Sequence, residues 1–177
     1  DSENGSQDDN SGSGALIRAI TRGYLDGKMT ALLNWPLIAA ITSNLPYPTT
    51  GLMVASQPWS ANYSVGHSLW ATAQVTQFTQ PGWQFLDGAS GYLGGDRTNG
   101  SYISLRSPSG TDYSTIVETT TATKPSTAMF SVSLSNKPIH VWATNISSTG
   151  DKDEFVHVAD LRPDTSGRFQ FAINPGN

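Results

Sequence analysis

The chain has 177 residues, of which 37% are hydrophobic and only 14% charged, so it can form a packed core but carries few surface charges. Its ten Lys and Arg residues are scattered and its net charge is −4, which disfavours nucleic acid and anionic membranes as partners. The absence of cysteine excludes disulfides, zinc–thiolate sites and cysteine nucleophiles, and no apolar run approaches the roughly 20 residues of a membrane span.

The first segments predict the end of an α/β unit. Residues 1–14 are wholly polar or glycine and predict a loop. Residues 15–26 predict a helix that stops at Gly27, because one face carries apolar side chains at helical spacing, namely Leu16, Ala19, Ile20 and Tyr24. The apolar run 29–35 predicts a strand buried on both faces, as in a parallel sheet. A second helix is expected within residues 36–45.

The middle of the chain predicts a long loop followed by a helix. Residues 46–66 are rich in Pro, Gly, Ser and Asn yet contain aromatic residues, and long loops of this kind are usually functional or disordered. Trp70, Gln74 and Phe78 are four residues apart, which indicates a helix over residues 67–78.

From Pro81 onward, short alternating runs separated by turn residues predict strands of an antiparallel sandwich or barrel. These runs are 83–86, 102–106, 113–119, 129–134, 139–143, 155–160 and 169–173. The fold class is therefore mixed: the C-terminal βα portion of a (β/α)8 barrel over residues 1–80, followed by an antiparallel β-sandwich over residues 81–177. A whole barrel needs about 250 residues, so we expect the remainder of the barrel upstream of Asp1.

The glutamates are the first candidates for chemistry. Glu3 precedes the loop before the α/β segment, where a barrel strand would end and catalytic carboxylates project. A carboxylate at such a position is, by itself, more often a solvated charge. Glu118 and Glu154 are assigned structural or solubility roles. No metal site or cofactor is expected, because the three histidines have neither metalloprotease spacing nor sequence neighbours that would form a cluster with carboxylates.

The tryptophans are the second group of candidates, for sugar binding, because the flat C–H faces of sugars stack on aromatic rings. Trp35 would end the buried strand and Trp59 lies in the aromatic loop, so these two are the binding candidates. Core packing is expected for Trp70, Trp83 and Trp142. Sequons at Asn4, Asn62, Asn99 and Asn145 favour a secreted glycoprotein, with Asn62, Asn99 and Asn145 as possible glycosylation sites.

Several runs of the chain resemble the galactocerebrosidase family of glycoside hydrolases. The most specific is the heptad from Gln77 to Trp83, Gln-Phe-Thr-Gln-Pro-Gly-Trp. The other matching pieces follow the family's order: Ser2-Glu3 with Ser6, Tyr24-Leu25-Asp26-Gly27-Lys28-Met29-Thr30, Trp35, Leu45-Pro46-Tyr47, Gly51-Leu52-Met53 and Pro58-Trp59-Ser60. The resemblance is good over residues 2 to 118 and loose beyond them.

The resemblance implies a retaining, exo-acting hydrolase that removes β-linked galactose from a glycolipid or glycan, secreted or, in an animal, lysosomal. It implies that Glu3 is the nucleophile, that Ser6 lies beside the pocket and that Trp35 walls the galactose site. The family's acid/base glutamate lies upstream and is absent here, so we expect the chain alone to be inactive. Where the animal enzymes place a substrate-contacting arginine, residues 120–129 offer only Lys124.

Two further hypotheses belong to other classes. A non-catalytic carbohydrate-binding β-sandwich would explain the β-rich, tryptophan-bearing second half of the chain. A structural surface domain would leave the matches at Glu3 and Trp35 unexplained. An upstream barrel with an Asn-Glu pair at a strand end would favour the enzyme over both.

Overall fold

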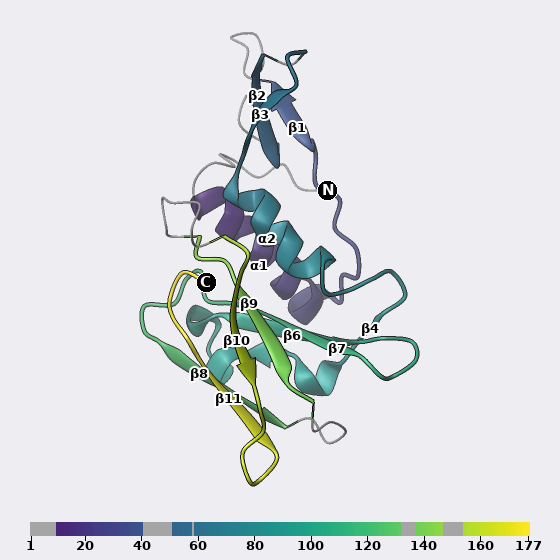
Figure 1. The fold of residues 1–177 in the computed structure, drawn as a ribbon, viewed down its shortest axis with the longest axis vertical. Coiled ribbons are helices and arrows are strands. Elements are labelled where there is room, and N and C mark those ends of the chain that lie inside the picture. Colours follow the sequence, from purple (N-terminus) through teal and green to yellow (C-terminus); the bar gives the residue numbers. More distant parts are fainter. Residues whose placement is uncertain (1–9, 41–50, 58, 132–136, 147–153) are drawn as a thin grey trace.

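The computed structural model describes residues 10–40, 51–57, 59–131, 137–146 and 154–177, and it combines helices with small, mostly antiparallel sheets (Figure 1). The helices are α1 (Asn10–Gly27) and α2 (His67–Thr76), with single 3-10 turns at η1 (Asp87–Ala89), η2 (Leu93–Gly95) and η3 (Arg97–Asn99). The strands are β1 (Ile38–Ala40), β2 (Met53–Gln57), β3 (Asn62–Val65), β4 (Gln84–Phe85), β5 (Gly91–Tyr92), β6 (Ser101–Arg106), β7 (Tyr113–Glu118), β8 (Ser126–Ser131), β9 (Ile139–Ala143), β10 (Val156–Leu161) and β11 (Arg168–Ile173). The helices predicted at residues 15–26 and 67–78 and the seven predicted strand runs are thus confirmed where residues are described. Helix α1 begins at Asn10, so the prediction of a loop is wrong for residues 10–14.

The main core lies between the two helices and the four-stranded sheet. Strand β6 pairs with β7 along one edge and with β4 and β5 along the other. Because side chains alternate along a strand, Ile103 and Leu105 share one face of β6, and Ile116 of β7 lies opposite Ile103. These residues are buried against Ile17 and Tyr24 of α1. Burying each large aliphatic side chain contributes about 1.5–3 kcal/mol, so this core stabilises the junction of helices and sheet.

Two ribbons extend the β-rich region: β8 pairs with β11 and β9 pairs with β10, each antiparallel. Phe130 and Phe169 are paired in register and stacked, with ring centroids 5.8 Å apart. The end of the chain joins the layers, because Thr119 donates its backbone N–H to the Asn177 carbonyl at 2.6 Å and Ile146 donates to the Gly176 carbonyl at 3.0 Å. The arrangement is sandwich-like, in agreement with the predicted β-sandwich.

The segment between the helices differs from the sequence prediction. Residues 29–33 form no strand, and the side chain of Leu33 is 73% exposed, so the prediction of a doubly buried strand is wrong in this structure. A buried strand needs neighbours to bond its backbone and cover both faces, and no described strand pairs with these residues. The expected helix within 36–45 is also wrong at residues 38–40, which form β1; residues 41–45 lie outside the described part.

The predicted long loop contains a β-hairpin. Strands β2 and β3 are antiparallel, and β1 adds to β2 in parallel, forming the three-stranded sheet drawn at the top of Figure 1. The turn at residues 59–61 is held by Ser60, whose hydroxyl donates to the Gln57 carbonyl at 2.7 Å. Period-2 alternation is hard to recognise here because Tyr63 and Val65 lie on an exposed strand.

Candidate functional site

Of the residues predicted to form the active site, Glu3 and Ser6 lie outside the described residues, and their roles stay predictions. The same holds for the sequon at Asn4. The structure therefore bears on the candidate site through its tryptophans, through the motifs that carry the family resemblance, and through the cavity of the β-rich region.

The two tryptophans predicted to bind sugar present their rings to solvent. Trp35 precedes β1 and is 60% exposed, and Trp59 is 98% exposed at the turn between β2 and β3. Neither ring packs in a core in this structure, which leaves open aromatic faces of the kind that sugar C–H groups stack on. The described aromatic contacts do not join the two rings to each other.

The motif from Tyr24 to Lys28 fastens the end of α1 to the four-stranded sheet. Tyr24 is buried and stacks on Phe85 with centroids 4.0 Å apart, while its hydroxyl donates to Asp87 at 2.5 Å. Lys28 also donates to Asp87, and its ammonium lies 4.6 Å from the centre of the Tyr24 ring. The hydrogen bond to Asp87 is the main cause that raises the pKa of Tyr24 to about 12. This motif therefore has a structural role.

Asp26 of the same motif makes a second polar contact between α1 and the sheet region. Its carboxylate accepts from the Tyr92 hydroxyl and from the Arg97 guanidinium, each at 2.7 Å. The hydrogen bond from Tyr92 is the largest cause that lowers the pKa of Asp26, and the Arg97 contacts act in the same direction. The carboxylate is ionised at neutral pH and is engaged in joining α1 to the β5–β6 region.

A buried ion pair continues this interface. Glu118 is 1% exposed, and its Oε1 accepts from Arg22 of α1 at 2.9 and 3.0 Å and from the Ser101 hydroxyl at 2.6 Å. Its Oε2 accepts from the backbone N–H and the hydroxyl of Thr120 at 3.1 and 2.9 Å. Every oxygen of this buried carboxylate is thus satisfied within the protein, in agreement with the structural role expected for Glu118.

The heptad from Gln77 to Trp83 ends α2 and leads into β4. The Thr79 hydroxyl donates to the Val75 carbonyl at 2.8 Å, and the backbone reverses near Gly82, whose φ of +93° suits glycine. Phe78 packs against Trp142 and Phe155 at centroid distances of 6.0 and 5.7 Å. The heptad therefore connects the helical half of the protein to the β9–β10 ribbon.

The tryptophans predicted to be in the core differ in their surroundings. Trp83 packs against the main core, and Trp70 stacks on Phe155 with its centroid 6.1 Å away. Trp142 is 37% exposed and lines a cavity, so core packing is only part of its environment.

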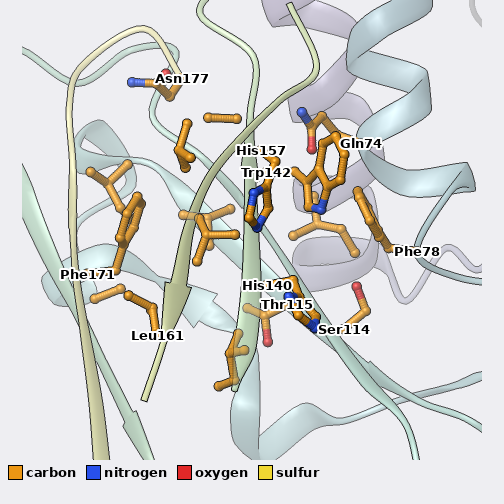
Figure 2. Close-up of a pocket in the computed structure, with 18 of the residues that line it drawn as sticks. Gln74, Phe78, Ser114, Thr115, His140, Trp142, His157, Leu161, Phe171 and Asn177 are labelled. Atoms are coloured by element: carbon orange, nitrogen blue, oxygen red, sulfur yellow. The ribbon is translucent and has the colours of Figure 1, made fainter. Parts of the chain in front are cut away.

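A cavity of about 1350 Å³ lies between the helices, the edge strand β7 and the two ribbons (Figure 2). Most of its lining is apolar, but Gln74, Ser114, His140, Trp142 and His157 give it one polar wall. Its volume exceeds the roughly 300–1,000 Å³ of an ordinary ligand pocket. In such pockets a few polar groups orient the ligand, so the polar wall is the part of this cavity that is suited to ligand recognition.

The structure brings together three side chains of types that can ligate a metal, which the sequence analysis did not connect. His140 Nδ1 and His157 Nε2 lie 2.6 and 2.8 Å from the same Asp160 oxygen. His67 Nε2 lies 3.3 Å from a Glu154 carboxylate oxygen, so the expectation that no histidine lies beside a carboxylate is wrong for all three histidines. Hydrogen bonds from His140, and then from His157, lower the pKa of Asp160. The sequence signal was weak because His140 and Asp160 are brought together by strand pairing across twenty positions.

The remaining predicted positions are the asparagines of the sequons. Asn62 is exposed, and Asn99 is exposed with its amide donating to the Leu93 carbonyl at 3.3 Å, while Asn145 is half-buried. Whether they are glycosylated stays a prediction. Neither of the described helices has the length and apolar character to cross a membrane.

Comparison with known proteins finds similarity over most of the chain. Residues 1–77 match the family model described as glycosyl hydrolase family 59. The galactocerebrosidase of Danio rerio is 35% identical over 159 residues, covering 87% of this chain and 22% of that protein. The human galactocerebrosidase is 32% identical over 181 residues, covering 92% of this chain and 26% of that protein, and the dog enzyme is 43% identical over 108 residues, covering 61% and 15%. The chain thus spans about a quarter or less of the length of these relatives.

Proposed function

Since this chain belongs to the galactocerebrosidase family, glycosyl hydrolase family 59, we propose that it is the nucleophile-bearing part of a retaining, exo-acting enzyme that removes β-linked galactose. The observation that carries the proposal is the family match over residues 1–77, because this range contains Glu3, Ser6, Trp35 and Trp59. The name of the relatives supports a galactolipid as the substrate class. The proposed reaction uses no cofactor.

The chemistry is a double displacement with Glu3 as the covalent nucleophile. The ionised carboxylate attacks the anomeric carbon while a second carboxyl group protonates the leaving oxygen, and water then releases the sugar. Retaining pairs lie about 5–5.5 Å apart, so the two groups must meet in one cleft. We assign the second group to the barrel residues that precede this chain, and residues 1–80 to the C-terminal portion of that barrel.

The exposed tryptophans fit the binding half of this proposal. Trp35 and Trp59 offer open ring faces, and both lie within the residues that match the family model. In this proposal Trp35 walls the galactose site, Ser6 lies beside it, and Trp59 contacts the sugar or its aglycone. A secreted or lysosomal location would suit such an enzyme, and the exposed sequon at Asn62 is compatible with it.

Covalent trapping tests the nucleophile. The full-length protein that contains this chain is treated with an activated 2-deoxy-2-fluorogalactoside and digested, and the labelled peptide is mapped by mass spectrometry. We expect the label on Glu3, and we expect Glu3→Gln to abolish labelling while Glu154→Gln, the matched loss of another carboxylate, retains it. A label on any other side chain would overturn the assignment.

Activity of the isolated chain tests the assignment of the acid/base group to other residues. General acid assistance is worth about 10²–10⁴-fold, so the 177-residue chain is expected to show no turnover of a nitrophenyl β-galactoside. Clear turnover by the purified chain that is lost in Glu3→Gln would show that a complete site lies within it.

A second candidate is a non-catalytic carbohydrate-binding sandwich, favoured by the partly exposed Trp142 on the polar wall of the cavity. Galactose titration followed by tryptophan fluorescence distinguishes the two functions. Binding that is lost in Trp142→Ala and unaffected by Glu3→Gln and Trp35→Ala would support the binding module. Binding that depends on Trp35 and not on Trp142 supports the enzyme.

A further inference from the structure

Three side chains that no proposed catalytic role uses converge on the β9–β10 ribbon. His140 stands on β9, while His157 and Asp160 stand on β10. One nitrogen of each imidazole and one carboxylate oxygen lie within 4.8 Å of one another. The side chains of His140, His157 and Asp160 are 63%, 42% and 51% exposed, so a dissolved ion can reach them. Figure 2 shows both imidazoles on the wall of the cavity.

A β-bulge makes this convergence possible. Side chains three residues apart on a regular strand point to opposite faces, so His157 and Asp160 would ordinarily diverge. The pairing changes register between His157 and Ala159: His157 lies opposite Trp142, and Ala159 lies opposite Val141. Val158 is the extra residue, and the bulge turns His157 onto the face of Asp160. Cross-strand pairing of Asp160 with His140 completes the triplet.

Aromatic packing restricts the movement of the His157 ring. The Trp142 ring lies 5.3 Å from the His157 ring, and Trp142 in turn packs on Phe155 and Phe78 at 5.1 and 6.0 Å. A ligand whose ring is held by its neighbours loses less conformational entropy on binding, which favours a defined coordination geometry. The two histidine rings are 6.1 Å apart and inclined at 49°, so their edges can be directed at a common point between them.

The donor set selects a class of ion. Two imidazole nitrogens and one carboxylate oxygen suit borderline divalent ions such as Zn²⁺, whereas Ca²⁺ and Mg²⁺ prefer oxygen ligands. At Zn–ligand bond lengths of about 2.05 Å, neighbouring ligand atoms of a tetrahedral site lie about 3.3 Å apart. The N–O distances of 2.6 and 2.8 Å must therefore open by about 0.5–0.7 Å. The Asp160 side chain is 51% exposed, which leaves it room to rotate.

We propose that His140, His157 and Asp160 form a binding site for a Zn²⁺-type divalent ion that joins β9 to β10, with a coordination position left open toward the cavity. Three protein ligands and an open position are the arrangement of zinc sites that bind a further ligand. The ion replaces the two hydrogen bonds that Asp160 accepts from the imidazoles. It then links β9 to β10 at the polar wall of the cavity. This site is independent of Glu3 and of the hydrolase function.

Zinc titration of the metal-free protein tests the proposal. The protein is dialysed against chelator, and Zn²⁺ is added in a calorimeter to the wild type and to His140→Gln, His157→Gln, Asp160→Asn and His67→Gln. We expect one ion per chain at micromolar concentrations and a loss of affinity of about 10-fold or more in each of the first three variants. His67→Gln removes the chain's other histidine, which pairs with Glu154 and is not one of the three clustered side chains, and this variant is expected to bind like the wild type.

A spectroscopic measurement on the wild type avoids dependence on the folding of variants. In ¹H–¹⁵N spectra of the imidazoles, Zn²⁺ is expected to shift the resonances of His140 and His157 and leave those of His67 unchanged. The proposal is overturned if binding requires millimolar Zn²⁺, if all four variants bind equally, or if the two ring spectra do not change at saturating metal.

Discussion

Replacement of Glu118 by glutamine removes the negative charge from the interface between α1 and the four-stranded sheet. The carboxylate is buried and accepts five hydrogen bonds, three on Oε1 and two on Oε2. A glutamine carbonyl can keep the three donors on the first oxygen. Its amide then faces the Thr120 backbone N–H, a second donor, so that N–H loses its acceptor.

The cost follows from these contacts. A buried donor without an acceptor costs about 1–3 kcal/mol, and breaking a buried ion pair costs about 3–5 kcal/mol because the remaining charge is left uncompensated. Since Arg22 is only 13% exposed, we expect Glu118→Gln to lower the free energy of unfolding by about 3–5 kcal/mol. This is a large share of the roughly 5–15 kcal/mol by which domains are stable.

Urea unfolding followed by tryptophan fluorescence measures this effect, with Arg22→Gln as the partner variant and Arg97→Gln as the control. Arg97 pairs with Asp26 at 2.7 Å, but both side chains are well exposed, so its loss is expected to cost less than about 1 kcal/mol. The double variant of Arg22 and Glu118 should cost clearly less than the sum of the single variants. If Glu118→Gln and Arg22→Gln cost no more than Arg97→Gln, the reasoning from burial is wrong.

Two further predictions concern the same interface. The raised pKa of Tyr24 means that the folded state holds the phenol proton; the associated stability is complete below the ordinary value near 10 and is lost as the pH rises through about 12. Burial raises the pKa of Tyr92 as well, so ultraviolet titration should show late-ionising tyrosines in the wild type. The contribution of Tyr24 should move toward pH 10 in Asp87→Asn, and an unchanged curve would contradict the assigned hydrogen bond. Gly100→Ala should destabilise the protein by about 2–4 kcal/mol in thermal unfolding, because φ is +111° and a Cβ would lie 2.1 Å from the Glu118 carbonyl oxygen. Gly88→Ala, which has open space around it, is the control, and equal effects of the two substitutions would refute the steric argument.

Local patterns in the sequence were sufficient for the elements that carry a regular apolar face. Spacing predicted the helix at residues 15–26, but not its first turn at residues 10–14, and it predicted the helix at 67–76 and the strands at 101–106 and 113–118, because one face of each packs on the same core. The family resemblance also rests on local runs, and the comparisons confirm it. The role of Glu3, the barrel origin of residues 1–80 and the boundary near residue 80 stay predictions, and the main core includes residues on both sides of that boundary.

The chain by itself therefore determined the family, the mixed composition of helices and antiparallel strands, and the structural character of Glu118. Only the tertiary structure decided that the Tyr24–Lys28 motif fastens a helix to a sheet, that residues 53–65 form a hairpin, and that His140 meets His157 and Asp160. The physical reason is register: side chains on paired strands meet or diverge according to a shift of one residue, and the shift at Val158 arises from the pairing of two strands.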